Sequence, residues 1–304
     1  MPVNLAGLWV PIATPFAATG NVDLSLLVAH GKRLITDGAT GLAILGTTSE
    51  ANSLTLDERR AVIDACIAGG ISPERLMPGT GSPALGDAVA LTRHATAAGC
   101  RGVLLLPPFY YKNITDDGLF EFAARLIEGC GRFTPRILLY HIPQQSVVGW
   151  SIPLIARLRE AFPGVIVGMK DSSGDLARVE QASAFADFAI FPGSEAKVVA
   201  AMALGAVGSV SAGGNINARA IAELVAVAGK PEAAALQVAV NAVRVALSDR
   251  ALIASVKAVI AAQTGDANWR RVRPPLLELT EAERSALLAS PAIRALLPAP
   301  AIAV

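Results

Sequence analysis

The chain has 304 residues, which is enough for one large α/β domain or two smaller ones. Hydrophobic residues make up 53% of it and charged residues 17%, so the composition supports a large core and leaves little for a solvated tail. Lysine and arginine number 26 against 25 acidic residues, a net charge of +1 without any basic block, which argues against nucleic acid as a partner.

We expect neither membrane insertion nor disulfide bonding. The longest uncharged span, residues 198–218, is interrupted by glycines and polar residues, so it predicts a helix, a turn and a strand. The N-terminus lacks the charged and apolar regions of a signal peptide. Cys66, Cys100 and Cys130 are far apart and odd in number, which predicts buried thiols in a reducing cytoplasm. The three histidines are scattered as well, so no metal site is expected.

Short apolar runs alternate along the chain with segments of helical periodicity. Strands are predicted at residues 8–16, 41–45, 76–80, 102–107, 136–142, 165–170, 188–194 and 208–212. Helices are predicted between and after them, at residues 22–37, from 56 onward, at 84–98, at 116–129, from 152 onward, up to 184, in a short stretch before 208, and at 218–228.

Eight buried strand-then-helix units indicate a parallel sheet, and eight is the number that closes a barrel. A doubly wound open sheet would carry a glycine-rich dinucleotide fingerprint after its first strand, and residues 14–16 contain none. The fold class predicted is therefore α/β, a (β/α)8 TIM barrel over residues 1–229. Residues 230–304 are predicted to form a C-terminal helical extension packed on the barrel, where it shapes the mouth or a subunit contact.

The sixth predicted strand ends in a single lysine, Lys170, followed by a polar turn that contains glycine. An ordinary lysine has a pKa near 10.4, so about 4.6 kcal/mol separates it from being half neutral at pH 7. An apolar wall lowers the pKa of a lysine and so reduces this free-energy difference, which yields an amine able to form a Schiff base with a carbonyl substrate. The simpler alternative is a lysine whose amine merely reaches solvent at the end of a strand.

Active sites of such barrels gather at the carboxyl ends of the strands. The polar residues and glycines predicted there are Thr14, Thr47, Thr48, Tyr110, Tyr140, Lys170, Gly193, Glu195 and Ser211. One amine, several hydroxyls and two phenols, with no set of metal ligands, are suited to carbonyl chemistry through an iminium. Taken singly, Tyr140 can equally be a core tyrosine and the two threonines can cap a turn.

Four short motifs carry a resemblance to a known family: GTTSE at 46–50, YHIP at 140–143, GMKD at 168–171 and GSVS at 208–211. In order and spacing over essentially the whole chain, the sequence resembles the dihydrodipicolinate synthase and N-acetylneuraminate lyase family. The resemblance implies a (β/α)8 class I aldolase or lyase that binds pyruvate, or a 2-keto acid that becomes pyruvate, as a lysine Schiff base. It implies no metal or other cofactor, and a homo-oligomer, commonly a tetramer of two tight dimers.

The resemblance also implies catalytic roles. Lys170 matches the Schiff-base lysine, and Tyr140 matches the phenol that moves protons around it. Thr47 matches a hydroxyl that relays protons. Tyr110 matches a relay tyrosine that reaches the neighbouring subunit's site in many members.

Substrate-binding roles are implied in the same way. Thr48 matches a contact to the pyruvate carboxylate, while Gly193 and Val210 match backbone and wall positions beside the keto acid. Gln145 stands where the lysine-pathway synthase has an arginine that holds the carboxylate of aspartate semialdehyde, and an amide does not replace that charge. Ser49 replaces the family's usual glycine, which could alter the loop or narrow the carboxylate pocket.

We therefore expect an enzyme that joins pyruvate reversibly to an aldehyde, or cleaves a 4-hydroxy-2-keto acid. Its partners would be small molecules and further copies of itself. The alternatives are 4-hydroxy-tetrahydrodipicolinate synthase proper and a 2-keto-3-deoxy sugar acid dehydratase that uses the same iminium. A keto-acid sensor without turnover is the rival from another class, because a fold alone does not fix function.

Overall fold

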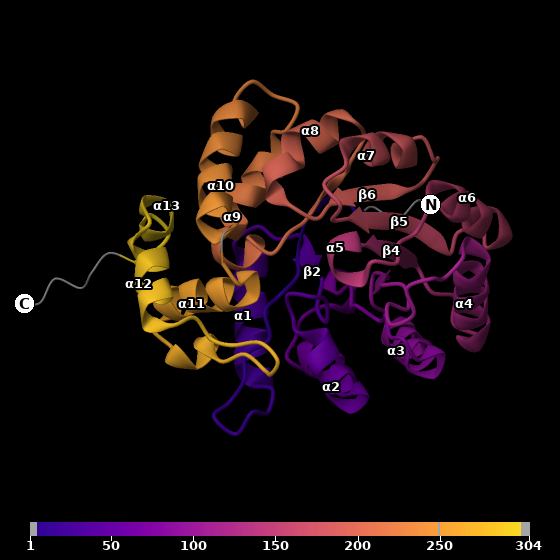
Figure 1. Ribbon diagram of the computed structural model, residues 1–304, viewed down its shortest axis with the longest axis horizontal. Helices are drawn as coiled ribbons and strands as arrows, with labels where there is room; N and C mark the ends of the chain where they lie inside the picture. Colours follow the sequence, from indigo (N-terminus) through magenta and orange to yellow (C-terminus); the bar gives the residue numbers. More distant parts are fainter. Residues whose placement is uncertain (1–4, 249, 299–304) are drawn as a thin grey trace, which may run out of the picture.

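The computed structural model of the chain describes residues 5–248 and 250–298. Seven parallel strands line the centre of the molecule (Figure 1), in the hydrogen-bonded orders β2-β1-β7 and β3-β4-β5-β6. Their bounds are β1 (Gly7–Val10), β2 (Gly41–Leu42), β3 (Val103–Leu105), β4 (Ile137–His141), β5 (Ile166–Asp171), β6 (Ala189–Pro192) and β7 (Gly208–Val210).

Residues 76–80 take the place between β2 and β3 that the third predicted strand was expected to fill. They form the isolated parallel bridges Leu42↔Leu76 and Gly79↔Leu104 and backbone hydrogen bonds to both neighbours, but no continuous ladder. Pro78 explains the interruption, because proline has no N–H to donate to a ladder. On the other side, the N–H of Val207 donates to the carbonyl of Ile190 at 3.0 Å and joins β7 to β6. The predicted (β/α)8 barrel is confirmed, with one position held by an irregular strand.

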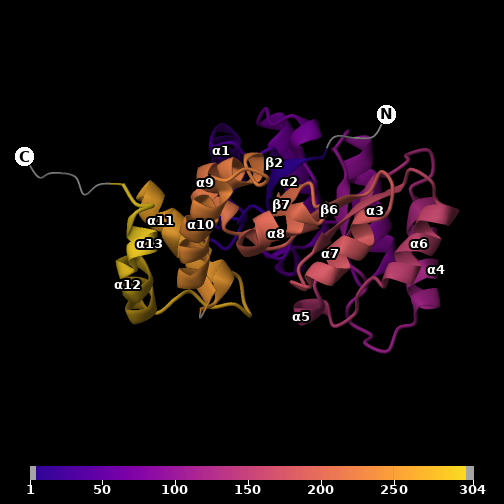
Figure 2. The ribbon, with the colours of Figure 1, turned by 90° about the horizontal axis from the view of Figure 1, so that it is seen from above.

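The helices surround the strands (Figures 1 and 2). Around the barrel these are α1 (Leu24–Thr36), α2 (Leu56–Ala68), α3 (Leu85–Ala97), α4 (Asp116–Gly129), α6 (Ile152–Ala161), α7 (Leu176–Ser183), α8 (Val198–Ala203) and α9 (Gly214–Ala226), with the short α5 (Pro143–Ser146) after β4. Within residues 5–248 and 250–298, no helix combines the length and apolar character needed to cross a membrane.

Local sequence signals set where the helices begin. Thr55 and Glu58 form a capping box at the start of α2, in which each side chain bonds the other residue's backbone N–H. Thr115 accepts a bond from a backbone N–H in the first turn of α4, and Ser151 does the same for α6, which also has Pro153 in its first turn. These caps satisfy N–H groups that have no partner within the helix.

The side chains along each strand alternate between two apolar layers. In β1, Trp9 faces the barrel interior with Leu138 and Phe191, while Leu8 and Val10 pack outward in the core beneath the helices. This period of two means that every second residue of a strand points into the barrel. The outer layer is the larger of the two and holds the helices on the strands.

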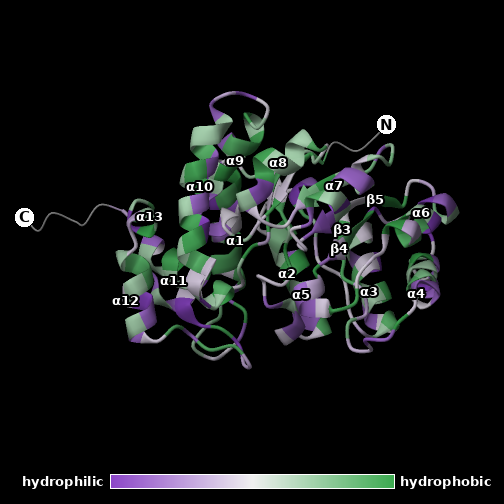
Figure 3. Ribbon diagram, turned by 45° about the horizontal axis from the view of Figure 1, so that its top comes forward, coloured by the Kyte–Doolittle hydropathy of each residue, from purple (hydrophilic) through white to green (hydrophobic). Residues whose placement is uncertain are grey.

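The C-terminal helices lie together on one side of the barrel (Figures 1 and 2). They are α10 (Ala233–Ser248), α11 (Leu252–Thr264), α12 (Glu281–Ala289) and α13 (Pro291–Arg294). Apolar residues run along α9 and α10 (Figure 3), and the extension shares a core with the barrel residues Ala13 and Ile216. The boundary between 229 and 230 stays a prediction. The ends of the two predicted regions, residues 1–4 and 299–304, lie outside the described residues, as does residue 249.

A buried histidine joins the extension to the barrel. The ring of His30 in α1 lies edge-on to Trp269, with 4.7 Å between centroids, and its Nε2 lies 3.3 Å from Oδ1 of Asn215. Burial, and then the positive charge of Arg33, lowers the pKa of His30 from 6.5 to about 3. The folded protein therefore holds this imidazole neutral at pH values where an unfolded chain would protonate it.

We expect this histidine to make stability fall in mild acid. The contribution of this neutral imidazole to the free energy of unfolding is complete above pH 6.5. It is lost as the pH falls from 6.5 toward 3, by up to about 1.4 kcal/mol per pH unit. Urea unfolding at pH 7 and pH 5 should show a smaller pH dependence for His30→Gln than for the wild type. His94→Gln, at a partly exposed histidine, is the control. Equal pH dependence in wild type and His30→Gln would contradict the expectation.

Candidate active site

Lys170 and Tyr140 face each other across neighbouring strands. They are register partners in β5 and β4, and the Nζ of Lys170 lies 4.1 Å from the centroid of the Tyr140 ring. Leu138, two residues before Tyr140, is in the interior layer, and Met169 beside Lys170 is in the outer core, so the alternation aims both side chains into the barrel. Lys170 is 5% exposed and Tyr140 4% exposed. The amine is not in bulk solvent.

The phenol of Tyr140 also meets a hydroxyl. Its oxygen lies 3.3 Å from Oγ1 of Thr47, in the loop after β2. Burial raises the pKa of Tyr140, but the charge of Lys170 and hydrogen bonds from Thr47, Lys170 and Ser172 outweigh it, so the net direction is downward. A phenol with a lowered pKa gives up its proton more readily and can act as both acid and base.

The loop carrying Thr47 and Thr48 is fixed to the segment that follows β1. The Oγ of Ser49 donates to the carbonyl of Ile12 at 2.5 Å, and Oγ1 of Thr14 donates to the carbonyl of Ser49 at 2.8 Å. Ser49 therefore anchors the loop. Its side chain is not part of the cleft wall described below.

The same loop is tied to the C-terminal extension by a buried ion pair. Glu50 and Lys257 of α11 are both fully buried as side chains, with Oε1 and Nζ 2.6 Å apart. The backbone N–H of Arg273 donates to the other carboxylate oxygen at 2.8 Å. Burial lowers the pKa of Lys257, and the neighbouring carboxylate of Glu50 opposes that shift. The sequence analysis did not find this pair, although a single lysine within the apolar run of α11 was a signal for it.

Replacing Lys257 with alanine should lower the free energy of unfolding by about 3–5 kcal/mol, because the carboxylate of Glu50 is left buried without its counterion. Urea denaturation measures this. Arg284→Ala, which removes a surface pair with Glu281, is the control and should cost about 0–1 kcal/mol. The double variant Glu50→Gln, Lys257→Met should recover much of the loss, because it removes both charges. A single Lys257→Ala as mild as the surface control would refute the role of the pair.

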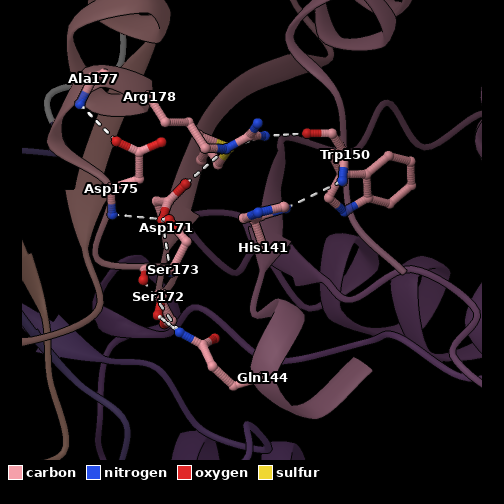
Figure 4. A network of polar contacts seen from close by, with 10 residues as sticks. His141, Gln144, Trp150, Asp171, Ser172, Ser173, Asp175, Ala177 and Arg178 are labelled. Atoms are coloured by element: carbon pink, nitrogen blue, oxygen red, sulfur yellow. Dashed lines mark hydrogen bonds and ion pairs between the residues drawn. The ribbon is translucent and has the colours of Figure 1, made fainter. Parts of the chain in front are cut away.

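A second polar network holds the segment after Lys170 (Figure 4). The carboxylate of Asp171 pairs with Nε of Arg178 at 2.8 Å and accepts from the N–H of Ser173 at 2.8 Å. Nε2 of Gln144 donates to the carbonyl of Ser172, also at 2.8 Å. These contacts fix the backbone on the carboxyl side of the lysine and so limit where its amine can point.

The amine, phenol and hydroxyl lie in a cleft of about 500 Å³. It is lined by Pro11, Thr47, Thr48, Tyr140, Ile142, Gln144, Gln145, Lys170, Ser172, Gly193, Ser194, Ala212, Arg244, Ala251, Leu252, Ile253, Ala254, Leu276 and Leu277. Loops of the barrel mouth thus form one wall, and α10, α11 and the segment before α12 form the other. The extension shapes the mouth. A cleft of this size and mixed polarity suits a small organic substrate.

Six of the eight residues that the sequence analysis assigned to the site line this cleft: Lys170, Tyr140, Thr47, Thr48, Gly193 and Gln145. Val210 is fully buried in the interior apolar layer and does not line it. Tyr110 is 72% exposed and lies outside the cleft of its own chain.

The remaining rim candidates do not reach the cleft either. Thr14, Glu195 and Ser211 are buried, and the hydroxyl of Ser211 bonds the carboxylate of Glu195. Among the residues that the structure describes, no group of three or more histidine, cysteine or acidic side chains could hold a metal ion.

A parallel barrel with a buried lysine at a strand's carboxyl end, faced by a phenol and a hydroxyl, has the groups that a Schiff-base-forming lyase requires. Residues 4–291 match the model of the Dihydrodipicolinate synthetase family, and the chain belongs to this family. The predicted family, the enzyme class and the pyruvate-dependent class I aldolase or lyase activity are thereby confirmed.

Curated relatives and solved structures agree. The chain is 36% identical over 214 residues to a 4-hydroxy-tetrahydrodipicolinate synthase of Rhizobium meliloti, covering 70% of this chain and 71% of that protein. It is 34% identical over 207 residues to one of Thermus thermophilus, covering 67% and 68%. The dihydrodipicolinate synthase structure from Agrobacterium tumefaciens is similar with a TM-score of 0.87 and 33% identity, covering 96% of this chain and 99% of that one.

Proposed function

We propose that Lys170 is the nucleophile that binds pyruvate and that the enzyme joins it reversibly to an aldehyde. The amine nitrogen bonds to the keto carbon, and the keto oxygen leaves as water to give an iminium. Loss of a proton from the methyl carbon gives an enamine, which bonds to the aldehyde carbon while the aldehyde oxygen takes up a proton, and water then releases the hydroxy keto acid and the free amine. The observation that carries this proposal is the Nζ of Lys170 lying 4.1 Å from the Tyr140 ring within the cleft.

Tyr140 and Thr47 are proposed to move the protons of these steps. The phenol oxygen lies 3.3 Å from the threonine hydroxyl, and both residues line the cleft beside Lys170. Water must leave as the iminium forms and return as it is hydrolysed, so a group that gives and takes a proton is needed at each step. The lowered pKa of Tyr140 fits that exchange.

Thr48 is proposed to contact the pyruvate carboxylate, and Gly193 to form the wall beside the bound keto acid. Both line the cleft, Thr48 with a hydroxyl and Gly193 with a backbone that has no side chain between it and a ligand. A Cβ at Gly193 would meet Oγ of Ser172 at 2.0 Å and Cα of Ser172 at 2.9 Å, so a larger residue here would have to displace Ser172. The N–H of Gly193 donates to the carbonyl of Asp171 at 2.6 Å, so this glycine supplies room for the keto acid and not a donor for its carboxylate.

We propose that the protein assembles as a homo-oligomer, a dimer or tetramer, in which Tyr110 approaches the neighbouring subunit's site. Tyr110 and Tyr111 are 72% and 74% exposed and pack edge to face against each other, with 5.3 Å between centroids. Two adjacent exposed aromatic rings are typical of a protein contact. The three free, buried cysteines fit a reducing compartment, so the proposed location is the cytoplasm.

The second substrate is proposed to differ from that of the lysine-pathway synthase. Relatives carry the name 4-hydroxy-tetrahydrodipicolinate synthase, which makes that activity the second candidate. Gln145, however, lines the cleft with a neutral amide where the synthase has its arginine. Another aldehyde, or cleavage of a 4-hydroxy-2-keto acid, suits this cleft better. Assaying pyruvate with aspartate semialdehyde separates the two: turnover as fast as with the best other aldehyde would favour the synthase.

Borohydride reduction tests the Schiff base itself. Incubation with pyruvate and borohydride should add the reduced pyruvyl group to the peptide that contains Lys170, as seen by mass spectrometry. Exchange of the pyruvate methyl protons with deuterium, followed by NMR, should show that the enamine forms. No adduct on Lys170, or an adduct without proton exchange, would remove the proposed function.

A further inference from the structure

The positive charges of the cleft come from two side chains. Among the residues that line it, Lys170 and Arg244 are the cationic ones, and none is acidic. Lys170 is accounted for by the Schiff base. Arg244 belongs to α10, in the wall contributed by the C-terminal extension, and no role derived so far uses it.

The packing of α10 directs Arg244 toward the barrel mouth. Seven residues earlier, the side chain of Gln237 accepts from the N–H of Val199 at 3.1 Å and donates to the carbonyl of Glu195 at 2.9 Å. These bonds fix which face of the helix meets the barrel. Residues seven apart lie on the same face of a helix, and Val240 between them is buried, so Arg244 continues that face.

The guanidinium of Arg244 has no partner among the residues that the structure describes. Within residues 5–248 and 250–298 it forms no ion pair and no side-chain hydrogen bond. Arg178 and Arg273, in contrast, are paired with Asp171 and Glu58. A half-buried, unpaired guanidinium in a cleft without acids attracts an anion, because the surrounding wall screens its charge less than bulk water does.

The two glutamines at the mouth do not supply this charge. Nε2 of Gln144 is committed to the carbonyls of Ser172 and Ser173, at 2.8 and 3.2 Å. Gln145 is neutral, and the walls around it are apolar, among them Ile142, Leu252 and Leu276. A substrate bound to Lys170 thus shares the cleft with apolar side chains and with one further, planar cation, Arg244.

We propose that Arg244 determines substrate specificity by binding a carboxylate at the end of the substrate remote from the keto carbon, on the aldehyde fragment. The proposal rests on the function proposed above. A guanidinium offers two parallel N–H donors that match the two oxygens of a carboxylate. A phosphate dianion would call for a second cation, and the described lining of the cleft has none beyond Lys170.

Keto acids that differ only at the far end test this assignment. Two diacids, 2-oxoglutarate and 2-oxoadipate, are compared with 2-oxopentanoate and 2-oxohexanoate, their neutral-ended counterparts of equal chain length. Each is trapped on Lys170 with borohydride over a range of concentrations, and the half-saturating concentration is read from the mass of the modified protein. Pyruvate is trapped in parallel as the reference for Schiff-base formation.

In the wild type, at least one diacid should half-saturate trapping on Lys170 at a concentration about tenfold or more below that of the neutral-ended keto acid of equal length. In Arg244→Gln this preference should disappear while trapping of pyruvate is unchanged. Arg244→Lys should keep part of the preference, because the charge remains but the two-pronged geometry is lost. Arg93→Gln, at an exposed arginine of α3, is the matched control and should leave all five values unaltered.

The outcomes separate the two proposals. A wild type that traps pyruvate but shows no preference for either diacid overturns the role of Arg244, whether or not the variants fold. So does a preference that persists in Arg244→Gln. A wild type that traps neither pyruvate nor any longer keto acid overturns the proposed function instead.

Discussion

Lys170→Arg should form no reducible adduct with pyruvate and should lose roughly 10⁴-fold or more in kcat/KM. The guanidinium stays protonated at neutral pH and has no free electron pair to attack the keto carbon, although its charge and length resemble those of lysine. The loss therefore reports nucleophilicity rather than charge. Mass spectrometry after borohydride treatment and steady-state kinetics with the best aldehyde measure it.

Lys32→Arg, on the exposed side of α1, is the matched control for this substitution and should behave as wild type. A thermal melt of Lys170→Arg shows whether the barrel is intact. An adduct that still forms in a folded Lys170→Arg protein would place the Schiff base on another amine. Lys257 is the other lysine buried in the described part of the chain, but it is bound to Glu50.

Tyr140→Phe should lower kcat by about 10²- to 10³-fold while leaving Lys170 able to trap pyruvate slowly. The phenylalanine keeps the ring that packs against the amine and removes only the hydroxyl that meets Thr47 at 3.3 Å. The proton transfers of the iminium steps then depend on water.

The pH profile distinguishes this loss from a packing defect. The pKa of Tyr140 lies below that of an ordinary tyrosine, so the phenolate form becomes available at lower pH than usual. The wild-type kcat should therefore carry a titration limb from this phenol, and Tyr140→Phe should lack it. Thr47→Val, which removes the neighbouring hydroxyl, should shift that limb to higher pH, because one hydrogen bond that favours the phenolate is gone. Identical profiles in all three proteins would refute a proton-transfer role.

Most of the barrel could be predicted from the sequence because buried parallel strands leave a simple pattern. The run into Lys170 predicted β5, and the period of two explains why the lysine and Tyr140 both face inward. The strand at 76–80 was predicted with the right position but the wrong regularity. Pro78 limits this segment to isolated bridges, because proline has no N–H to donate. The apolar pattern that predicts a strand does not reveal that missing donor.

The half of the site contributed by the extension could not be predicted. Arg244 and Lys257 lie in helices whose sequence pattern gives their amphipathic faces but not their placement on the barrel. Only the packed structure shows that one of these helices brings a cation to the mouth and the other a counterion to Glu50. Val210 was expected beside the substrate because of its place in the GSVS motif. In the structure, the alternation of side chains along the strand buries it in the interior layer.

The contact between Glu50 and Lys257 has a consequence for the order in which the protein matures. During synthesis the barrel strands emerge from the ribosome first, with the loop of Thr47 and Thr48 among them, while α11 is still unmade. Until that helix docks, Glu50 has no ammonium to meet, and the loop is held only by the bonds of Ser49 and Thr14. A nascent chain halted after α9 would thus carry every proposed catalytic residue, with its threonine loop anchored on one side alone.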